Sequence, residues 1–411
     1  RKSQNNTSML NDGKLAFMVH IIDTSNLAVH NLKREKDYHP INFVEKDTNK
    51  GTVRSAFTGM VIGFGETGRD AFRFLYEFSS FTKDNQGNPS AKKIHIIDKD
   101  IDELKAEFLT EAPALRNKSE IDWWNAQSTH SAAFWDKLKS IIQDLNYIVI
   151  SIKDDEEAVG IATSIFEYAY RYRDNFNRFK IFVRLRNSMR EDFLRNHKEF
   201  FETIIPFGSV MDAFSYDTIN KDVLEKAAKR FKYRYDILYE AKFDAIENGN
   251  EEEYANEAWL KRRKVYLEET DAVKQKESEI KIWYQEEQDR SNVWHIYTKI
   301  ALVNDDVTSE MLQLDSNKQL LQNLSDCEHL RWNAKMELLG FESATKEDIK
   351  KAEEKSKGKQ RKPWKSFKLR RHECIVDCLT LHSNPVLEKT IPYDESTVKL
   401  SFEMRDEIGT Y

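Results

Sequence analysis

The chain has few cysteines, little net charge and no long apolar run, and each absence excludes a class of protein. Its three cysteines, Cys327, Cys374 and Cys378, lie in the last quarter, and an odd number without a disulfide framework indicates a reducing compartment. Lysine plus arginine number 64 against 70 acidic residues, so the net charge of -6 carries no global signature of nucleic-acid binding. The longest apolar stretches, such as 147–152, fall far below the roughly 20 residues that span a bilayer. We therefore expect a cytosolic chain.

A chain of 411 residues with 40% hydrophobic side chains is long enough for two or three domains with cores of their own. Between residues 14 and 236, short apolar runs alternate with helical patterns. This alternation predicts an α/β domain with a doubly wound, mostly parallel sheet. We expect strands at 15–22, 59–62, 94–98, 121–124, 147–152, 180–183 and 203–205, and helices at 67–78, 131–145, 156–172 and 221–231.

The remainder of the chain divides by composition. Residues 1–7 are polar, which predicts a linker at 1–13, and we expect a further segment on the N-terminal side. Residues 237–289 carry charged and aromatic side chains at helical spacing with hardly a turn signal, which predicts a helical insert. Residues 290–411 predict a small, mainly α-helical module.

A glycine-rich turn after the strand at 59–62 is the most informative motif. Its G-x-G-x-x-G pattern, formed by Gly63, Gly65 and Gly68, lies directly between an apolar strand and a helical run. Gly63 permits a tight turn, Gly65 lets a pyrophosphate approach the backbone, and Gly68 lets helix and strand pack closely. Glu66 and Thr67 begin the helix, whose N-terminal amides would face the phosphate. The motif predicts the phosphate-binding start of a Rossmann-type nucleotide-binding domain.

Asp98 ends the next strand, where a carboxylate accepts hydrogen bonds from ribose hydroxyls. It comes about ten residues later than the usual spacing, and we attribute the delay to an inserted loop at 82–92. The alternative is a Rossmann-like domain that has lost its ligand, in which Asp98 only caps the strand end.

Charged residues follow two later strands, whose carboxyl ends should face the same crevice. Asp154 is a candidate ligand-binding residue, and the alternative is a helix start that Asp154 or Asp155 caps. Arg184 and Arg186 could bind a phosphate bidentately, and surface ion pairing explains them equally well.

Several of these segments resemble a known family. They are Asp23 to Asn26 before a helix, 61–68, Asp98 and 150–156. They resemble the RCK (regulator of potassium conductance) or TrkA-N ligand-sensing Rossmann domains of bacterial ion channels and transporters, over residues 14–230. The resemblance implies a nucleotide ligand, such as NAD, ATP, an ADP-ribose-like molecule or a cyclic nucleotide. It also implies a homo-oligomer, dimer or tetramer, and a membrane-spanning segment N-terminal to this chain.

The C-terminal module contains a segment at 327–341 with a helical period. Leu330, Ala334 and Leu338 would form an inward stripe, and Gly340 would end the helix.

Three residues of this segment, Glu328, Arg331 and Trp332, do not fit the stripe. A carboxylate, a guanidinium and an indole on neighbouring positions can stack on an aromatic ligand and bind it through hydrogen bonds. The alternative is that Arg331 and Trp332 hold the module together.

The same segment resembles the RyR domain, the repeat named after ryanodine receptors, over residues 290–400. The matching residues are Glu328, His329, Arg331, Trp332, Gly340, Phe341, 371–376 and the pair Tyr393 and Asp394. Phe341 replaces the usual Trp, and the insertion at 344–365 is long and basic. The resemblance implies a ligand-sensing module for adenine-type nucleotides, with Tyr393 among its binding residues.

Two further patterns leave alternatives open. Arg290 and Asn292 would line a ligand site between the helical insert and the C-terminal module, or Ser291 or Asn292 would cap a new helix. The lysine-rich run at 350–371 is simplest as a solvated loop, and nucleic acid is not an expected partner. The histidines and cysteines at 372–382 match no metal-ligand spacing, so we expect no metal.

Together these features predict a nucleotide-responsive regulatory domain on the cytoplasmic face of a bacterial inner membrane. It would gate an ion channel or another membrane effector, in stress or phage defence, by ligand-driven rearrangement of subunits. An NAD(P)- or nucleotide-dependent enzyme is the alternative, although no acid or base is paired with a nucleophile. A scaffold that only oligomerises is the third reading.

Overall fold

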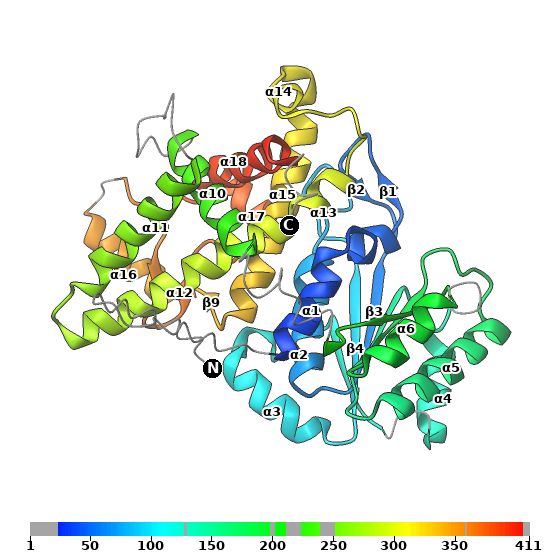
Figure 1. Cartoon of the computed structure of the whole chain (residues 1–411). Helices are drawn as coiled ribbons and strands as arrows, with labels where there is room; N and C mark the ends of the chain where they lie inside the picture. Colours follow the sequence, from blue (N-terminus) through cyan, green and yellow to red (C-terminus); the bar gives the residue numbers. More distant parts are fainter. Residues whose placement is uncertain are drawn as a thin grey trace, which may run out of the picture.

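The computed structural model describes residues 24–126, 130–197, 202–210, 223–238, 251–357 and 360–405. The linker expected at 1–13 and the strand expected at 15–22 lie outside these residues. Within them, a parallel sheet with helices on both faces lies beside a larger helical region (Figure 1).

The central sheet is six-stranded, parallel throughout, and has the strand order β5-β4-β3-β6-β7-β8. This is the order of doubly wound dinucleotide-binding sheets, in which the direction of winding reverses between the first strand and the fourth, here β3 and β6. The predicted α/β doubly wound fold is therefore confirmed. The strands are β3 (Phe57–Ile62), β4 (Lys92–Asp98), β5 (Ile121–Asn125), β6 (Tyr147–Ile150), β7 (Lys180–Arg184) and β8 (Ile204–Phe207).

Helices cover both faces because the strands are apolar on both sides. Side chains alternate between two separate buried clusters: Phe182 of β7 belongs to one, and Ile181 and Val183 belong to the other. The first cluster contains residues of α1 (Thr24–Arg34), α2 (Glu66–Phe78) and α3 (Ile101–Glu111). The second contains residues of α4 (Ala132–Ile141), α5 (Asp155–Tyr172) and α6 (Ser188–Asn196).

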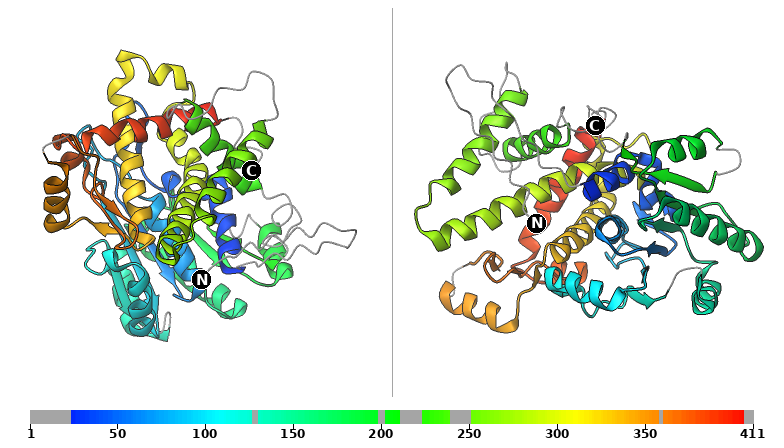
Figure 2. Two further views of the ribbon diagram at one scale, coloured as in Figure 1. Left: turned by 90° about the vertical axis from the view of Figure 1, so that its left-hand side faces the viewer. Right: turned by 60° about the horizontal axis from the view of Figure 1, so that its bottom comes forward.

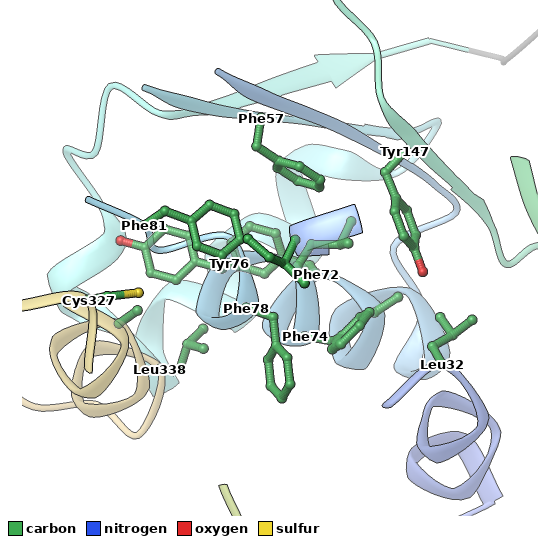
Figure 3. Close-up of a cluster of buried hydrophobic side chains, with 14 of the residues drawn as sticks. Leu32, Phe57, Phe72, Phe74, Tyr76, Phe78, Phe81, Tyr147, Cys327 and Leu338 are labelled. Carbon is green, nitrogen blue, oxygen red and sulfur yellow. The ribbon is translucent and has the colours of Figure 1, made fainter. Parts of the chain in front are cut away.

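Helix α2 lies at the centre of the first cluster (Figure 3). Phe57 of β3 points toward it from the sheet, Leu32 of α1 lies near Phe74, and Cys327 and Leu338 of the helical region lie on the opposite side of the cluster. Because α2 packs against three elements at once, a shift of this helix would change the packing of all three.

The helical region lies on the α1 and α2 side of the sheet, away from α4, α5 and α6 (Figures 1 and 2). Helix α15 contacts both α2 and α18, which explains why it is buried on several sides. None of the helices in the described ranges is both long and apolar enough to cross a bilayer. The helices of this region are α10 (Val223–Leu238), α11 (Glu251–Leu267), α12 (Ala272–Trp294), α13 (Ile296–Ala301), α14 (Ser309–Leu312), α15 (Lys318–Leu338), α16 (Lys346–Ser356), α17 (Cys378–Ser383) and α18 (Ile391–Glu403).

Short elements complete the fold. Strands β1 and β2 form an antiparallel pair, and β10, β11 and β9 form a small sheet beside α15. Their bounds are β1 (Lys46–Asp47), β2 (Thr52–Val53), β9 (Glu342–Ser343), β10 (Lys365–Ser366) and β11 (Arg371–His372). The 3-10 turns are η1 (Lys36–Tyr38), η2 (Pro40–Phe43), η3 (Pro113–Leu115), η5 (Asp315–Asn317) and η6 (Glu388–Thr390).

Two local predictions are wrong. Helix α12 runs without interruption through Ser291 and Asn292, so neither residue caps a new helix. The lysine-rich run is not simply a loop, because its first part forms α16, which begins with a capping box between Thr345 and Asp348.

The predicted inward stripe of α15 is only partly correct: Ala334 and Leu338 are buried, and Gly340 follows the end of this helix as expected. Leu330 is only partly buried, whereas Glu328 and Arg331 have exposed fractions of 2% and 0%. A helix enclosed on several sides has no single apolar face, so its hydrophobic period does not report which residues are buried.

Candidate functional site

The glycine-rich turn has the geometry that the motif predicts. Gly63 has a φ of +88°, which a residue with a side chain rarely adopts. A Cβ atom on Gly68 would lie 1.8 Å from the carbonyl oxygen of Gly63, so helix and strand approach too closely for any other residue. A Cβ atom on Gly65 would meet nothing within 4 Å. Gly65 therefore faces open space at the point where the chain leaves β3 and β6 toward opposite faces of the sheet.

The first turn of α2 begins at this open position. Gly65 is its N-cap, and because glycine has no side chain, no cap competes for the first-turn amides. Thr67 is buried against the turn, and Glu66 is exposed. Ser151, which follows β6, donates from Oγ to the carbonyl of Gly63 at 2.8 Å. The strand-turn-helix unit is thus tied to the neighbouring strand.

Asp98 lies beside the same turn. Its Oδ2 accepts a hydrogen bond from the backbone N–H of Phe64 at 2.7 Å, and its Oδ1 accepts one from Asp100 at 2.9 Å. A carboxylate oxygen has two lone pairs, so each oxygen can still accept a second bond. Asp98 therefore braces the turn and keeps acceptor capacity toward the crevice.

Asp154 is the N-cap of α5 and accepts hydrogen bonds from the N–H groups of Glu156 and Glu157, both at 2.9 Å. The helix-cap alternative is therefore confirmed for Asp154. Asp155 accepts from the backbone N–H groups of Arg186 and Asn187, which joins the loops after β6 and β7.

These two loops enclose an open hollow of about 400 Å³ at the carboxyl edge of the sheet. Both acidic and basic side chains line it, and their charges largely compensate. Its lining residues are Lys153, Asp154, Asp155, Arg186, Asn187 and Arg190.

Arg184 differs from the arginines around that hollow. It is 8% exposed, and its Nε and Nη1 atoms have no hydrogen-bond partner in the described part of the chain. Burial lowers the pKa of its guanidinium to about 10, and the nearby charge of Arg186 acts in the same direction. Arg186, by contrast, is exposed and donates to the carbonyls of Ile152 and Lys153.

The structure brings Glu328, Arg331 and Asn292 together, as a buried network. Arg331 donates from Nε and Nη2 to the two carboxylate oxygens of Glu328 at 3.0 and 2.7 Å. Its Nη2 also donates to Asn292 Oδ1 at 3.0 Å, and its Nη1 donates to Glu77 at 2.9 Å and to Ser291 Oγ. These contacts match the five N–H donors of a guanidinium, so the network itself satisfies Arg331.

Further buried charges extend this network. Lys299 of α13 is fully buried and lies 2.9 Å from Glu328. Burial alone would raise the pKa of Glu328, but Arg331 and Lys299 hold it at about 2. Arg290 points elsewhere and pairs with Glu225 and Glu287, which joins α12 to α10.

Trp332 lies on another side of α15. Its ring stacks on His329 at 5.9 Å and meets His372 edge-on at 5.2 Å. His329 is buried and lies 3.4 Å from Asp394, while Tyr393 is 50% exposed. Burial opposes protonation of His329, but the adjacent Asp394 outweighs it and raises the histidine pKa.

The predicted residues therefore fall into separate places. Gly63 to Gly68 and Asp98 surround the start of α2, and the Arg331 network surrounds its end. Residues 66 and 77 of one helix are separated by a rise of roughly 17 Å, so they do not form one site. Asp154 and Arg184 lie at the ends of two neighbouring strands.

Sequence reasoning missed Glu77 and Lys299, which complete the network. Each is a charged residue inside an apolar helical run, and a carboxylate near a helix C-terminus opposes the helix dipole. That misplacement is the signal that could have identified them.

No protein-family model, curated protein or solved structure matches this chain. Among the residues that the structure places, no group of three or more His, Cys, Asp or Glu side chains is arranged to hold a metal ion. The features that bear on function are the sheet order, the glycine turn and the buried charges.

Proposed function

We propose that this chain is a nucleotide-responsive regulatory module. A nucleotide phosphate binds at the start of α2, and α2 passes the effect of binding to the helical region. The observation that carries this proposal is that one helix begins at the open glycine turn and ends in contacts with α15.

The start of α2 favours a phosphate for three reasons. The uncapped amides and the helix dipole attract an anion. The absence of a Cβ atom at Gly65 leaves room for close approach to the backbone. The turn lies where the winding of the sheet reverses, which is where doubly wound sheets bind ligands. Asp98 is positioned beside the turn to accept from a ribose hydroxyl.

The end of α2 supports a regulatory role. Tyr76 donates from its hydroxyl to Glu337 of α15 at 2.8 Å, and Glu77 pairs with Arg331 of the same helix. Buried contacts of this kind are arranged in discrete ways and do not deform continuously. A ligand that prefers one position of α2 would therefore bias the arrangement of the helical region.

The side chains around the crevice favour binding over catalysis. Asp98, Asp154 and Asp155 each accept hydrogen bonds from backbone amides, which is typical of residues that brace loops. Catalysis would need an acid or base positioned on a reacting atom. The enzyme alternative predicts product formation, which chromatography of nucleotides after incubation with the chain would detect.

The wider role is also part of the proposal. The resemblance of 61–68 to RCK domains and of 328–332 to RyR domains supports a sensor of a bacterial ion channel or another membrane effector, working as a homo-oligomer. Membrane helices encoded ahead of Arg1 in the full gene would support this role, and their absence would overturn it. Light scattering with and without nucleotide would measure the subunit number.

Two substitutions of Gly65, one with and one without a negative charge, test the binding site. Gly65 has an extended backbone, φ −67° and ψ −166°, and space for a side chain. Asp and Asn are both good N-caps, so Gly65→Asp and Gly65→Asn should fold as well as the wild type. Only Asp adds a negative charge where the phosphate would bind.

The readout is the thermal shift with NAD, ATP, ADP-ribose and cyclic AMP. A ligand at 100 times its Kd stabilises by about 2.7 kcal/mol, which is readily detected. We expect the thermal shift to disappear in Gly65→Asp. In Gly65→Asn the shift should be larger than in Gly65→Asp. Equal shifts in the wild type and Gly65→Asp would place the ligand elsewhere, and no shift with any nucleotide would favour the scaffold reading.

Hydrogen exchange tests the transmission. Nucleotide should slow amide exchange in α2 and also in α15, which does not border the glycine turn. Tyr76→Phe, which removes the contact with Glu337, should weaken the effect in α15 and preserve it at the turn. Protection confined to the turn would overturn the regulatory part of the proposal.

A further inference from the structure

Arg184 occupies a defined place beside the glycine turn. Ile62, Ile150 and Val183 are in register across β3, β6 and β7. The next residue of each strand is Gly63, Ser151 and Arg184, so these three lie in one row at the carboxyl edge. Because side chains alternate along a strand, all three are on the face that α2 covers. Phe207, the partner of Arg184 on β8, belongs to the buried cluster on that face.

Among the described residues, the guanidinium of Arg184 has no ion-pair partner, although the charge of Asp155 acts on it from nearby. Its Nε and Nη1 atoms are buried without a hydrogen-bond partner in the described ranges. The carboxylate oxygens of the nearby Asp155 accept hydrogen bonds from the backbone N–H groups of Arg186 and Asn187. An unpaired buried guanidinium is strongly destabilising, and proteins normally pair such groups.

The other charged groups at this edge do not serve as its partner. Arg186 repels it, and Asp154 is engaged as the cap of α5. Asp98 is engaged by Phe64 and Asp100 at the end of β4, beyond β3. Among the residues that the structure describes, the row that contains the glycine turn therefore has a buried cation that forms no ion pair.

We propose that Arg184 binds a second anionic group of the ligand, next to the phosphate that the glycine turn holds. The ligand is then a nucleotide with at least two linked phosphates: a nucleoside diphosphate or triphosphate, or a dinucleotide bridged by a diphosphate. This inference rests on the proposed nucleotide site and specifies its ligand class.

The dimensions suit linked phosphates. Two strand spacings separate Gly63 from Arg184, about 10 Å, and an extended arginine side chain covers much of that distance. A planar guanidinium binds a phosphate through two parallel hydrogen bonds. A cyclic mononucleotide has a single phosphate, so it could occupy the turn or Arg184 but not both.

Arg184→Met tests the inference because it predicts opposite changes in two quantities. Without ligand, the variant should melt at a higher temperature than the wild type, since it removes an unpaired buried charge. With ligand, the Kd of ADP or ATP should rise about 10- to 100-fold, as expected for loss of a charge-assisted pair. The Kd of AMP should change little, so the preference for ADP over AMP should disappear.

Arg171→Met is the matched control. Arg171 lies on α5 with a 69% exposed side chain and makes only a loose contact with Glu167 at 4.0 Å. It removes the same charge from the surface, so the melting temperature and the ADP preference should stay at wild-type values. Inorganic pyrophosphate is a second probe, which should stabilise the wild type and not Arg184→Met.

The outcomes separate the inference from the proposed function. If ADP, ATP and pyrophosphate all fail to stabilise the wild type, the proposed nucleotide site and the role of Arg184 are both overturned. If Gly65→Asp abolishes the ADP shift and Arg184→Met leaves the ADP preference intact, only the role of Arg184 is overturned. A lower melting temperature of unliganded Arg184→Met would also overturn it, because that result would reveal a structural role.

Discussion

Arg331 of α15 and Glu77 of α2 form a buried ion pair, with 2.9 Å between Nη1 and Oε1 and no exposed surface on the arginine side chain. The pair joins the helix that starts at the glycine turn to the central helix of the helical region. Removal of one partner would leave an uncompensated charge in the interior. This contact therefore makes the stability of the two regions interdependent.

We predict that Arg331→Met destabilises the chain by about 3–5 kcal/mol, because Glu328 and Glu77 lose their shared counter-charge. Glu77→Gln should lower the free energy of unfolding by less, since Glu328 still neutralises Arg331. In the double variant, the cost should be smaller than the sum of the single costs by about 0.5–3 kcal/mol. Urea unfolding followed by tryptophan fluorescence measures all three values.

The exposed pair of Lys264 and Glu268 provides the control for this cycle. Their side chains are 75% and 65% exposed and lie 3.7 Å apart. The corresponding cycle with Lys264→Met and Glu268→Gln should give a coupling below about 1 kcal/mol. A coupling of similar size in both cycles would contradict the role assigned to Arg331 and Glu77.

Gly68→Ala should destabilise the chain, because the added methyl group would lie 1.8 Å from the carbonyl oxygen of Gly63. Forced repacking of this kind costs about 1–3 kcal/mol, and a backbone obstacle favours the upper end. Gly160→Ala, on α5, is the control: its Cβ atom would meet nothing within 4 Å. Alanine is favoured over glycine inside a helix, so the free energy of unfolding of this variant should rise by about 0.5–1 kcal/mol.

Calorimetric melting of the two glycine variants gives the comparison directly. Gly68→Ala should melt several degrees below the wild type, and Gly160→Ala should melt at or above it. A Gly68→Ala chain as stable as the wild type would show that α2 does not approach β3 as closely as described.

His295 should make the chain sensitive to acid. Burial lowers its pKa well below the usual value near 6.5, and neither ring nitrogen has a hydrogen-bond partner among the residues described. As the pH falls below about 6.5, the unfolded chain takes up a proton that the folded chain excludes, so stability falls. For one such histidine the loss is about 1.4 kcal/mol per pH unit.

His295→Leu should therefore reduce the slope of stability against pH between about 6.5 and 5. Above pH 7.5 neither state binds this proton, so the two slopes should coincide there. His39 adds a similar contribution, because burial lowers its pKa to about 4. Equal slopes for the wild type and His295→Leu at acidic pH would mean that His295 is protonated in the folded chain.

The three thiols should react slowly in the native chain. Cys327, Cys374 and Cys378 are all buried and free, and burial raises the pKa of Cys327 and of Cys374 to about 12. The thiolate is the reactive form, so both access and ionisation oppose labelling. We expect Ellman's reagent to label fewer than about one thiol per native chain within minutes and all three in urea. Rapid native labelling would contradict the packing of α15 and α17.

Local sequence predicted the sheet and its turn because the signals are local. The strands are apolar runs, and the roles of Gly63, Gly65 and Gly68 depend on residues within one strand-turn-helix unit. Asp154 was identifiable as a cap because capping involves amides two and three residues later. These features could be predicted without knowledge of the remaining fold.

The burial of Arg331 and its ion pair with Glu77 could not be predicted in this way. The sequence identified Glu328, Arg331 and Trp332 as unusual, but only tertiary structure placed Glu77, some 250 residues earlier, against the arginine. The helical period of α15 predicted its buried residues only in part for the same reason, since several distant helices surround it. The same holds for Arg184, because only the described segments packed near the end of β7 show that its Nε and Nη1 atoms have no hydrogen-bond partner there.

The sequence by itself therefore determined the α/β alternation, the glycine turn and the cap at Asp154, because short-range sterics and hydrogen bonds dictate them. Only the tertiary structure decided which charges are neutralised. Arg331 is satisfied within the protein, whereas Nε and Nη1 of Arg184 have no hydrogen-bond partner among the described residues, and this difference arises from the desolvation and distance of groups far apart in the chain.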